Sequence, residues 1–110
     1  MTQAHKRLGQ AAPAAATPVT LYTTPAATTT IVSEFAICNV GGGPLDSFSI
    51  FIVPTSLTAG PSNAICYNVP VASGNPCFLN IAQTLNTGDF IVVSSANGNV
   101  TFTCSGLEIS

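Results

Sequence analysis

Charged side chains are scarce in this sequence, and their scarcity excludes several classes of protein. Only six of the 110 residues are charged, or 5%, against roughly 25% in an ordinary soluble domain. Two of the six are basic, too few to neutralise a row of phosphates, so we expect no nucleic acid among the partners. The best apolar run, residues 48–53, has six residues where a membrane-spanning helix needs about 18, so we expect no membrane contact.

Groups that carry catalysis or bind metals are few and scattered. His5 is the single histidine, and no acidic residue lies within ten positions of it, so neither a catalytic base nor a metal ligand is expected there. The serines lack a histidine partner in the main domain, which excludes a hydrolase triad. The four acids follow no calcium-loop spacing: Glu34, Asp46, Asp89 and Glu108. We therefore predict that the protein is not an enzyme and uses no metal or cofactor.

The cysteines carry no recognisable site motif. Four of them allow three complete pairings, between which the sequence does not choose: Cys38, Cys66, Cys77 and Cys104. No CxxC motif is present, and the intervals of 28, 11 and 27 residues match no zinc site. We predict free, mostly buried thiols. The alternative is that Cys66 and Cys77, which flank a segment rich in turn-forming residues, cross-link a hairpin when oxidised.

From residue 19 onward the apolar residues recur with a period of two, which is typical of β-strands. Residues 100–105 alternate strictly between apolar and hydroxyl side chains, and Asn97-Gly98 and the glycine-proline segment 41–44 are turn signals. The predicted strands lie near residues 19–23, 30–39, 47–53, 64–69, 77–83, 89–95 and 99–106. Their number and spacing predict an all-β fold, a single antiparallel β-sandwich or jelly-roll-like domain over residues 19–110.

The long strand near residues 30–39 carries apolar side chains on both of its faces. Simple alternation predicts that Ile31, Phe35 and Ile37 share one face. Val32 then lies on the other face together with Glu34. We therefore expect this strand to be covered on both sides for part of its length.

Residues 1–18 differ in composition from the rest of the chain. Ala, Pro, Thr and Gln dominate, no periodicity appears, and both basic residues, Lys6 and Arg7, lie here. Residues 8–110 contain four acids and no base. We predict an extended N-terminal arm over residues 1–18. Either this arm is a frayed terminus, or it docks on a neighbouring subunit with Leu8 as its apolar anchor.

The shortage of charge also indicates assembly with other protein. Soluble domains keep themselves apart through surface charges of both signs, and they protect open sheet edges with lysine, proline or bulges. No lysine is present in residues 8–110. We therefore expect much of the surface to be covered by other subunits, most simply in a symmetric homo-oligomer.

Three stretches together carry a resemblance to a known family: residues 6–13 (KRLGQAAP), 21–33 (LYTTPAATTTIVS) and 99–110 (NVTFTCSGLEIS). The chain resembles the small virion structural proteins of tailed bacteriophages. The resemblance implies a capsid decoration (cement) or tail-associated protein without enzymatic activity. We expect a homotrimer on the capsid exterior, assembled in the host cytoplasm, that bridges subunits of the major capsid protein. In the arm, Lys6 and Arg7 would meet acidic shell residues and Leu8 would fill a pocket.

Two other functions are compatible with the sequence. One is a tail or baseplate module that recognises host glycans, and the other is a secreted adhesin domain. Copy number separates decoration from tail, because a decoration protein is present in hundreds of copies and a tail module in a handful. The N-terminal segment only faintly resembles a secretory signal, since proline interrupts its alanine-rich run.

Overall fold

The computed structural model describes residues 2–41, 45–74 and 76–110. Within these ranges the chain forms eight β-strands and one short 3-10 helix, in the following order. They are β1 (Gln3–Ala11), β2 (Val19–Thr23), β3 (Thr29–Asn39), β4 (Asp46–Val53), η1 (Pro61–Asn63), β5 (Ala64–Val71), β6 (Pro76–Leu85), β7 (Phe90–Ser95) and β8 (Val100–Ile109). Each of the predicted strands overlaps one of these. Of the predicted turn at 41–44, only Gly41 lies among the described residues.

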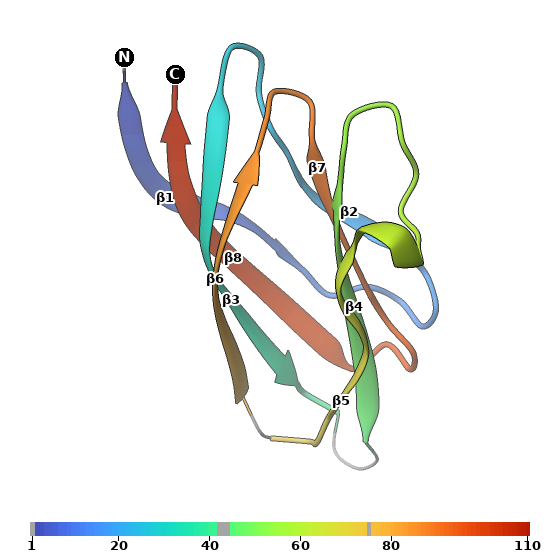
Figure 1. The fold of residues 1–110 in the computed structure, drawn as a ribbon. Coiled ribbons are helices and arrows are strands. Elements are labelled where there is room, and N and C mark those ends of the chain that lie inside the picture. The colour runs from blue at the N-terminus through green and yellow to red at the C-terminus, as the bar shows by residue number, and fades with distance from the viewer. Residues whose placement is uncertain (1, 42–44, 75) are drawn as a thin grey trace.

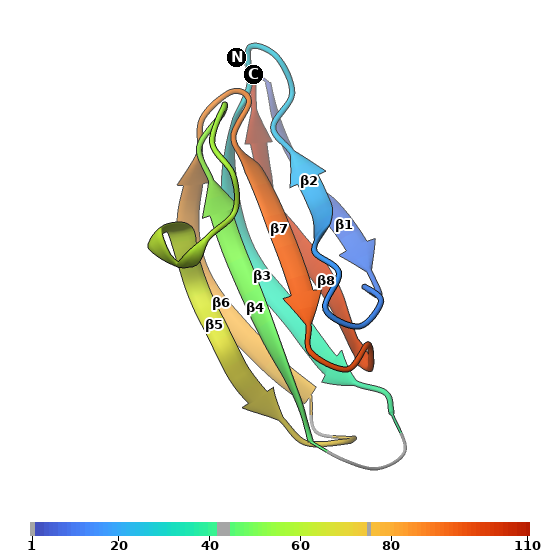
Figure 2. The same ribbon diagram turned by 90° about the vertical axis from the view of Figure 1, so that its right-hand side faces the viewer.

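The described strands form two four-stranded antiparallel sheets that pack face to face (Figures 1 and 2). Sheet A has the order β1-β8-β3-β6, and sheet B has the order β2-β7-β4-β5. Every connection except that between β4 and β5 crosses from one sheet to the other. This alternation is the jelly-roll arrangement of two interleaved Greek keys. The predicted antiparallel β-sandwich is therefore confirmed, with jelly-roll topology.

The N-terminal segment differs from the predicted arm. Residues Gln3–Ala11 form β1, which pairs antiparallel with β8 from Gln3 opposite Ile109 to Ala11 opposite Phe102. The physical reason is that β8 would otherwise have a free edge, and backbone donors and acceptors pair whatever the side-chain pattern. Residue 19 is thus the start of the second strand, and the sandwich already includes β1.

The core lies between the two sheets and is built from the inward-facing side chain of every second residue. Phe48 on β4 and Phe102 on β8 meet edge to face, with ring centroids 6.0 Å apart at 74°. Phe35 and Ile50 are fully buried beside them. Full burial of side chains of this size stabilises the fold by roughly 1.5–3 kcal/mol each.

The outer faces of the two sheets differ in how far other segments of the chain cover them. On sheet B, Phe51, Val53 and Val92 form a second buried cluster against Ala59, which belongs to the β4–β5 connection. Sheet A has no comparable cover among the described residues, and its outer side is open in Figure 1. The molecule therefore has one covered sheet face and one open sheet face.

Candidate functional site

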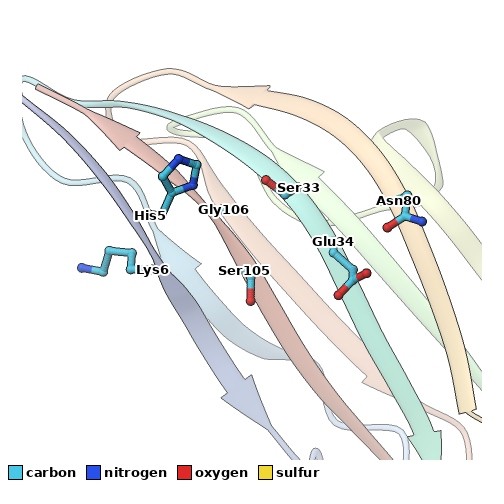
Figure 3. A pocket seen from close by; sticks show the side chains of 7 residues that line it. All are labelled: His5, Lys6, Ser33, Glu34, Asn80, Ser105 and Gly106. Atoms are coloured by element: carbon cyan, nitrogen blue, oxygen red, sulfur yellow. The ribbon is translucent and has the colours of Figure 1, made fainter.

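An open hollow of about 530 Å³ lies on the outer face of sheet A (Figure 3). Residues from all four strands line it: His5 and Lys6 on β1, Ser105 and Gly106 on β8, Ser33 and Glu34 on β3, and Asn80 on β6. The small residues on β8 leave room that the longer side chains around them do not fill. The hollow is therefore a polar depression with one carboxylate on its rim.

β-Bulges shape this part of the sheet. The register of β3 shifts between Val32 and Glu34 against both of its neighbours: against β8 the extra residue is Ser33, whereas against β6 the extra residue lies on β6. The register of β1 shifts between Arg7 and Gly9 against β8. A bulge bends its strand and re-aims the side chains that follow it. The bulge in β3 directs Glu34 outward and Phe35 inward, so alternation alone mispredicts the faces of this strand: Val32, Phe35 and Ile37 are buried in the core, and Ile31 is not.

One row of paired residues crosses the hollow. Arg7 lies opposite Ser105, Ser105 lies opposite Glu34, and Glu34 lies opposite Asn80. Residues directly opposite one another on neighbouring strands share a sheet face. Arg7 and Glu34 are both exposed, and within the described residues neither forms an ion pair. Since β8 separates their strands, their backbones are about 10 Å apart, twice the spacing of neighbouring strands.

The other charges are engaged within the described chain. Lys6 Nζ donates to Glu108 Oε1 at 3.3 Å, and the Tyr22 hydroxyl donates to Glu108 Oε2 at 2.5 Å. The Tyr22 hydroxyl also lies 2.8 Å from Thr30 Oγ1. Burial raises the pKa of Tyr22 to about 12, and its hydrogen bond to the carboxylate adds to the rise. The same hydrogen bond is the largest cause of a lowered pKa for Glu108.

The carboxylates of Asp46 and Asp89 accept hydrogen bonds from backbone N–H groups in and beside turns. Asp46 is buried and accepts three backbone N–H groups, from Ser47 at 2.7 Å, Asn97 at 2.9 Å and Asn99 at 3.0 Å. Asp89 accepts the backbone N–H groups of residues 55 and 86 at 3.0 and 2.9 Å. Of the six charged residues, Arg7 and Glu34 are thus the two without such a role in the described chain.

The three predicted arm residues separate in the structure. Leu8 is only 9% exposed and packs in the core of its own chain, so the chain as described offers no free apolar anchor there. Lys6 belongs to the cluster with Glu108, although it also borders the hollow. Arg7 lies on the open face of sheet A and is exposed. Arg7 is therefore the one of the three that is placed to meet another molecule.

Several residues of the open face were missed in the sequence. Phe78 on β6 is 59% exposed, and it lies opposite Ala36 on the outer face. Ile31 and Leu107 are half-buried and lie opposite each other on the same face. The signal in the sequence is an apolar residue at an outward position of a strand. This signal can be used only when the positions of the bulges are known, because the bulges decide which residues point outward.

Metal, thiol and membrane features add little to this face. Within the described residues, no three His, Cys, Asp or Glu side chains gather in a way that could hold a metal ion. The cysteines are free thiols; Cys104 is buried, and Cys38, Cys66 and Cys77 are half-buried. In the described part of the chain, no helix is long and apolar enough to cross a membrane.

Strand order and the open sheet face define the chain as a jelly-roll domain with one face available for contact. No protein-family model matches the sequence, and no curated protein matches it either. Among solved structures, the fold is similar to a chain in the structure of infectious bursal disease virus Gt strain, with a TM-score of 0.43 and 11% identity over 97% of this chain. A chain of the Gx strain of the same virus gives a TM-score of 0.41 and 14% identity over 97%. This chain spans 28% of the length of each of those chains.

Proposed function

We propose that this chain is a structural component of a virus particle, and specifically a decoration protein on the outside of a tailed-bacteriophage capsid. In this role it bridges neighbouring subunits of the major capsid protein and associates with further copies of itself. The observation that carries the proposal is the open, charge-poor face of sheet A on a jelly-roll domain. The family resemblance of the three sequence stretches supports the bacteriophage origin.

The composition of the surface supports a role among close neighbours. Four of the six charges are engaged inside the described chain, which leaves the open face with one cation and one anion. Such a surface loses little hydration when another protein covers it, because few charges have to be desolvated. Contacts of this kind across capsid subunits bury additional area and raise the barrier to rupture of the shell.

The alternative within the same class is a tail or baseplate module that binds host glycans. The hollow on sheet A favours it to the extent that its lining is polar and offers hydroxyl and amide groups. Against it, the described residues that line the hollow include no Phe, Tyr or Trp side chain on which a sugar ring could stack. We therefore put the decoration role first.

Quantitative mass spectrometry of purified particles, combined with an electron-microscopy map, tests the proposal. The decoration role predicts hundreds of copies per particle and density on the capsid exterior. A handful of copies at the tail would support the alternative instead. Absence of the chain from purified particles would overturn both.

A stability measurement tests the mechanical role. Particles stripped of the chain should release their nucleic acid at a lower temperature than intact particles, and rebinding of purified chain should restore the intact value. Two variants of the rebound chain provide a matched comparison, because Phe78 on the open face and Leu57 in the β4–β5 connection are 59% and 58% exposed. Phe78→Glu should fail to restore the release temperature, whereas Leu57→Glu should restore it. Equal release temperatures for stripped and intact particles would contradict a cementing role.

A further inference from the structure

We propose that the outer face of sheet A is a self-association surface, on which a second copy of this chain docks about a two-fold axis that runs parallel to β8 over Ser105. In this arrangement Arg7 of each copy enters the hollow beside Glu34 of the other. The starting observation is that Arg7 and Glu34 are exposed, opposite in charge and without an ion pair in the described chain, and that they lie on one face in one row.

Their spacing explains why the two charges are suited to an intermolecular pair. Arg7 on β1 and Glu34 on β3 flank β8 symmetrically, with Ser105 between them in register. Rotation by 180° about an axis parallel to β8 exchanges the positions of β1 and β3. Each Arg7 therefore comes to lie over the partner's Glu34, and the contact forms twice because a two-fold interface is self-complementary.

The hollow fits a guanidinium group. Its lining offers the Glu34 carboxylate together with the Ser33 and Ser105 hydroxyls and the Asn80 amide, all of which contain acceptor oxygens. The cation of the lining, Lys6, is paired with Glu108. An arginine presents five N–H donors in a planar fork, which suits a carboxylate with neighbouring acceptors. The small Ser105 side chain on β8 leaves the space that an incoming long side chain requires.

The rows beside the charged row add apolar contact. On the next row, His5, Leu107 and Ile31 lie opposite one another across β1, β8 and β3. The same rotation brings Leu107 against its counterpart, and it brings His5 over Ile31. Both aliphatic side chains are half-buried in the single chain, so a partner would complete their burial.

The size of the face sets the expected strength. With the axis over β8, the strands β1, β8 and β3 face the same three strands of the partner. Three strands about 4.8 Å apart and about 30 Å long present roughly 430 Å² of flat area, about half of the ~800 Å² per partner of a standard interface. The purified dimer is therefore expected to be weak. The occupancy of the contact increases where copies are held close together on a larger assembly, because their effective concentration is higher there. The charge pattern thus favours a two-fold contact, whereas the homotrimer was expected with the family resemblance.

A charge exchange tests the contact on the purified full chain by sedimentation equilibrium and native mass spectrometry. Arg7→Glu and Glu34→Arg should each weaken self-association at least ~10-fold, because each brings like charges together. The double variant R7E/E34R should return to within about threefold of the original chain, since the pair is restored with reversed polarity. Thr20→Glu adds a negative charge to an exposed position of β2 in sheet B and should change nothing.

Each possible result of these measurements either supports or overturns the proposed contact. A chain that stays monomeric at millimolar concentration overturns the proposal, and so do single variants that associate like the original chain or a double variant that is not rescued. Circular dichroism of each variant establishes that it is folded. This inference deepens the self-association that the proposed function includes, but the test needs no particles. A monomeric chain found in virions would therefore refute the contact alone, and a dimeric chain absent from virions would refute the function alone.

Discussion

The scarce charges of this protein act mainly as fixed acceptors for particular hydrogen bonds. Asp46 is the clearest example, because its two oxygens hold the start of β4 and the β7–β8 turn together through three backbone N–H groups. The turn contains Gly98 with a φ of 79°, a conformation that suits glycine. A carboxylate with only 2% exposure is thus retained because both of its oxygens accept backbone N–H groups.

Replacement of Asp46 by alanine tests this role. Asp46→Ala leaves three backbone donors without their acceptor, and we expect a loss of about 2–4 kcal/mol in the free energy of unfolding. Asp46→Asn, which keeps one oxygen, should lose less. Urea denaturation followed by circular dichroism measures both. Glu34→Ala is the matched control and should stay within about 0.5 kcal/mol, as exposed substitutions do; equal losses at 34 and 46 would contradict the role.

The Tyr22–Glu108 hydrogen bond predicts that the stability of the folded chain depends on pH in the acidic range. The folded pKa of Glu108 is lowered, chiefly because Tyr22 donates to the carboxylate, so the folded state favours the ionised form. Its contribution to stability is complete above the ordinary carboxyl value of 4.5, and it is lost as the pH falls through the lowered folded value.

Glu108→Gln removes that ionisation. The variant should be less stable than the original chain at neutral pH, and the difference should shrink below pH 4.5. Urea midpoints measured as a function of pH provide the test. A difference that is constant from neutral to acidic pH would show that ionisation of Glu108 does not contribute.

At the scale of secondary structure, β1 depends on its neighbours. Its sequence has no apolar alternation; Leu8 is the one buried residue that it adds to the core, and the half-buried Ala11 packs against that core. Gly106 on β8 makes room for it: a Cβ at Gly106 would lie 3.0 Å from Leu8 Cδ1 and 2.5 Å from the Ile31 carbonyl oxygen. β1 is therefore a strand because the edge of β8 pairs with it and because one side chain fits the space beside a glycine.

Leu8→Ala tests the anchoring of β1. We expect a loss of about 2–3 kcal/mol in the free energy of unfolding, from the apolar contact and the cavity left behind. Hydrogen exchange should accelerate most at the amides of β1 and least at those of β4 and β7, the inner strands of sheet B. His5→Ala, an exposed position on the same strand, should leave exchange in β1 unchanged. Uniform acceleration in every strand would indicate that β1 has no separate opening.

Strands differ in how far the sequence predicted them. The seven strands from β2 to β8 lie within a few residues of their predicted bounds, because alternating apolar residues and turn-forming residues mark both their length and their ends. β1 was missed because its pairing is decided by the backbone of β8. The faces of β3 were mispredicted before the bulge because Ser33 shifts the alternation by one residue, which moves Val32 into the core and Ile31 out of it.

Seen as a whole, the molecule carries its most protected thiol in the middle of sheet A. Cys104 on β8 is 0% exposed, and burial raises its pKa to about 12. A thiol reacts with alkylating agents as the thiolate, and this one reaches solvent only when the sandwich opens. Cys104 is therefore a natural reporter of global unfolding.

Timed alkylation with peptide mapping tests that role. Cys104 should be modified at least ~10-fold more slowly than the half-buried Cys38, and urea below the unfolding midpoint should accelerate Cys104 in step with the unfolding equilibrium. In fully denatured, unreduced protein we expect four modified thiols. A native rate for Cys104 equal to that of Cys38 would contradict the prediction, and fewer than four modified thiols would reveal a disulfide.

The sequence by itself determined that the chain folds as an antiparallel β-sandwich, because a period of two gives each strand one apolar face that only a second sheet can bury. It also determined the shortage of charge on which the proposals about partners depend. Tertiary structure alone decided the jelly-roll order, the incorporation of β1 and the row that holds Arg7 and Glu34 on one open face. These features depend on which strand edges are free and on where bulges shift the register, and both are properties of backbone pairing between distant segments rather than of any local pattern of side chains.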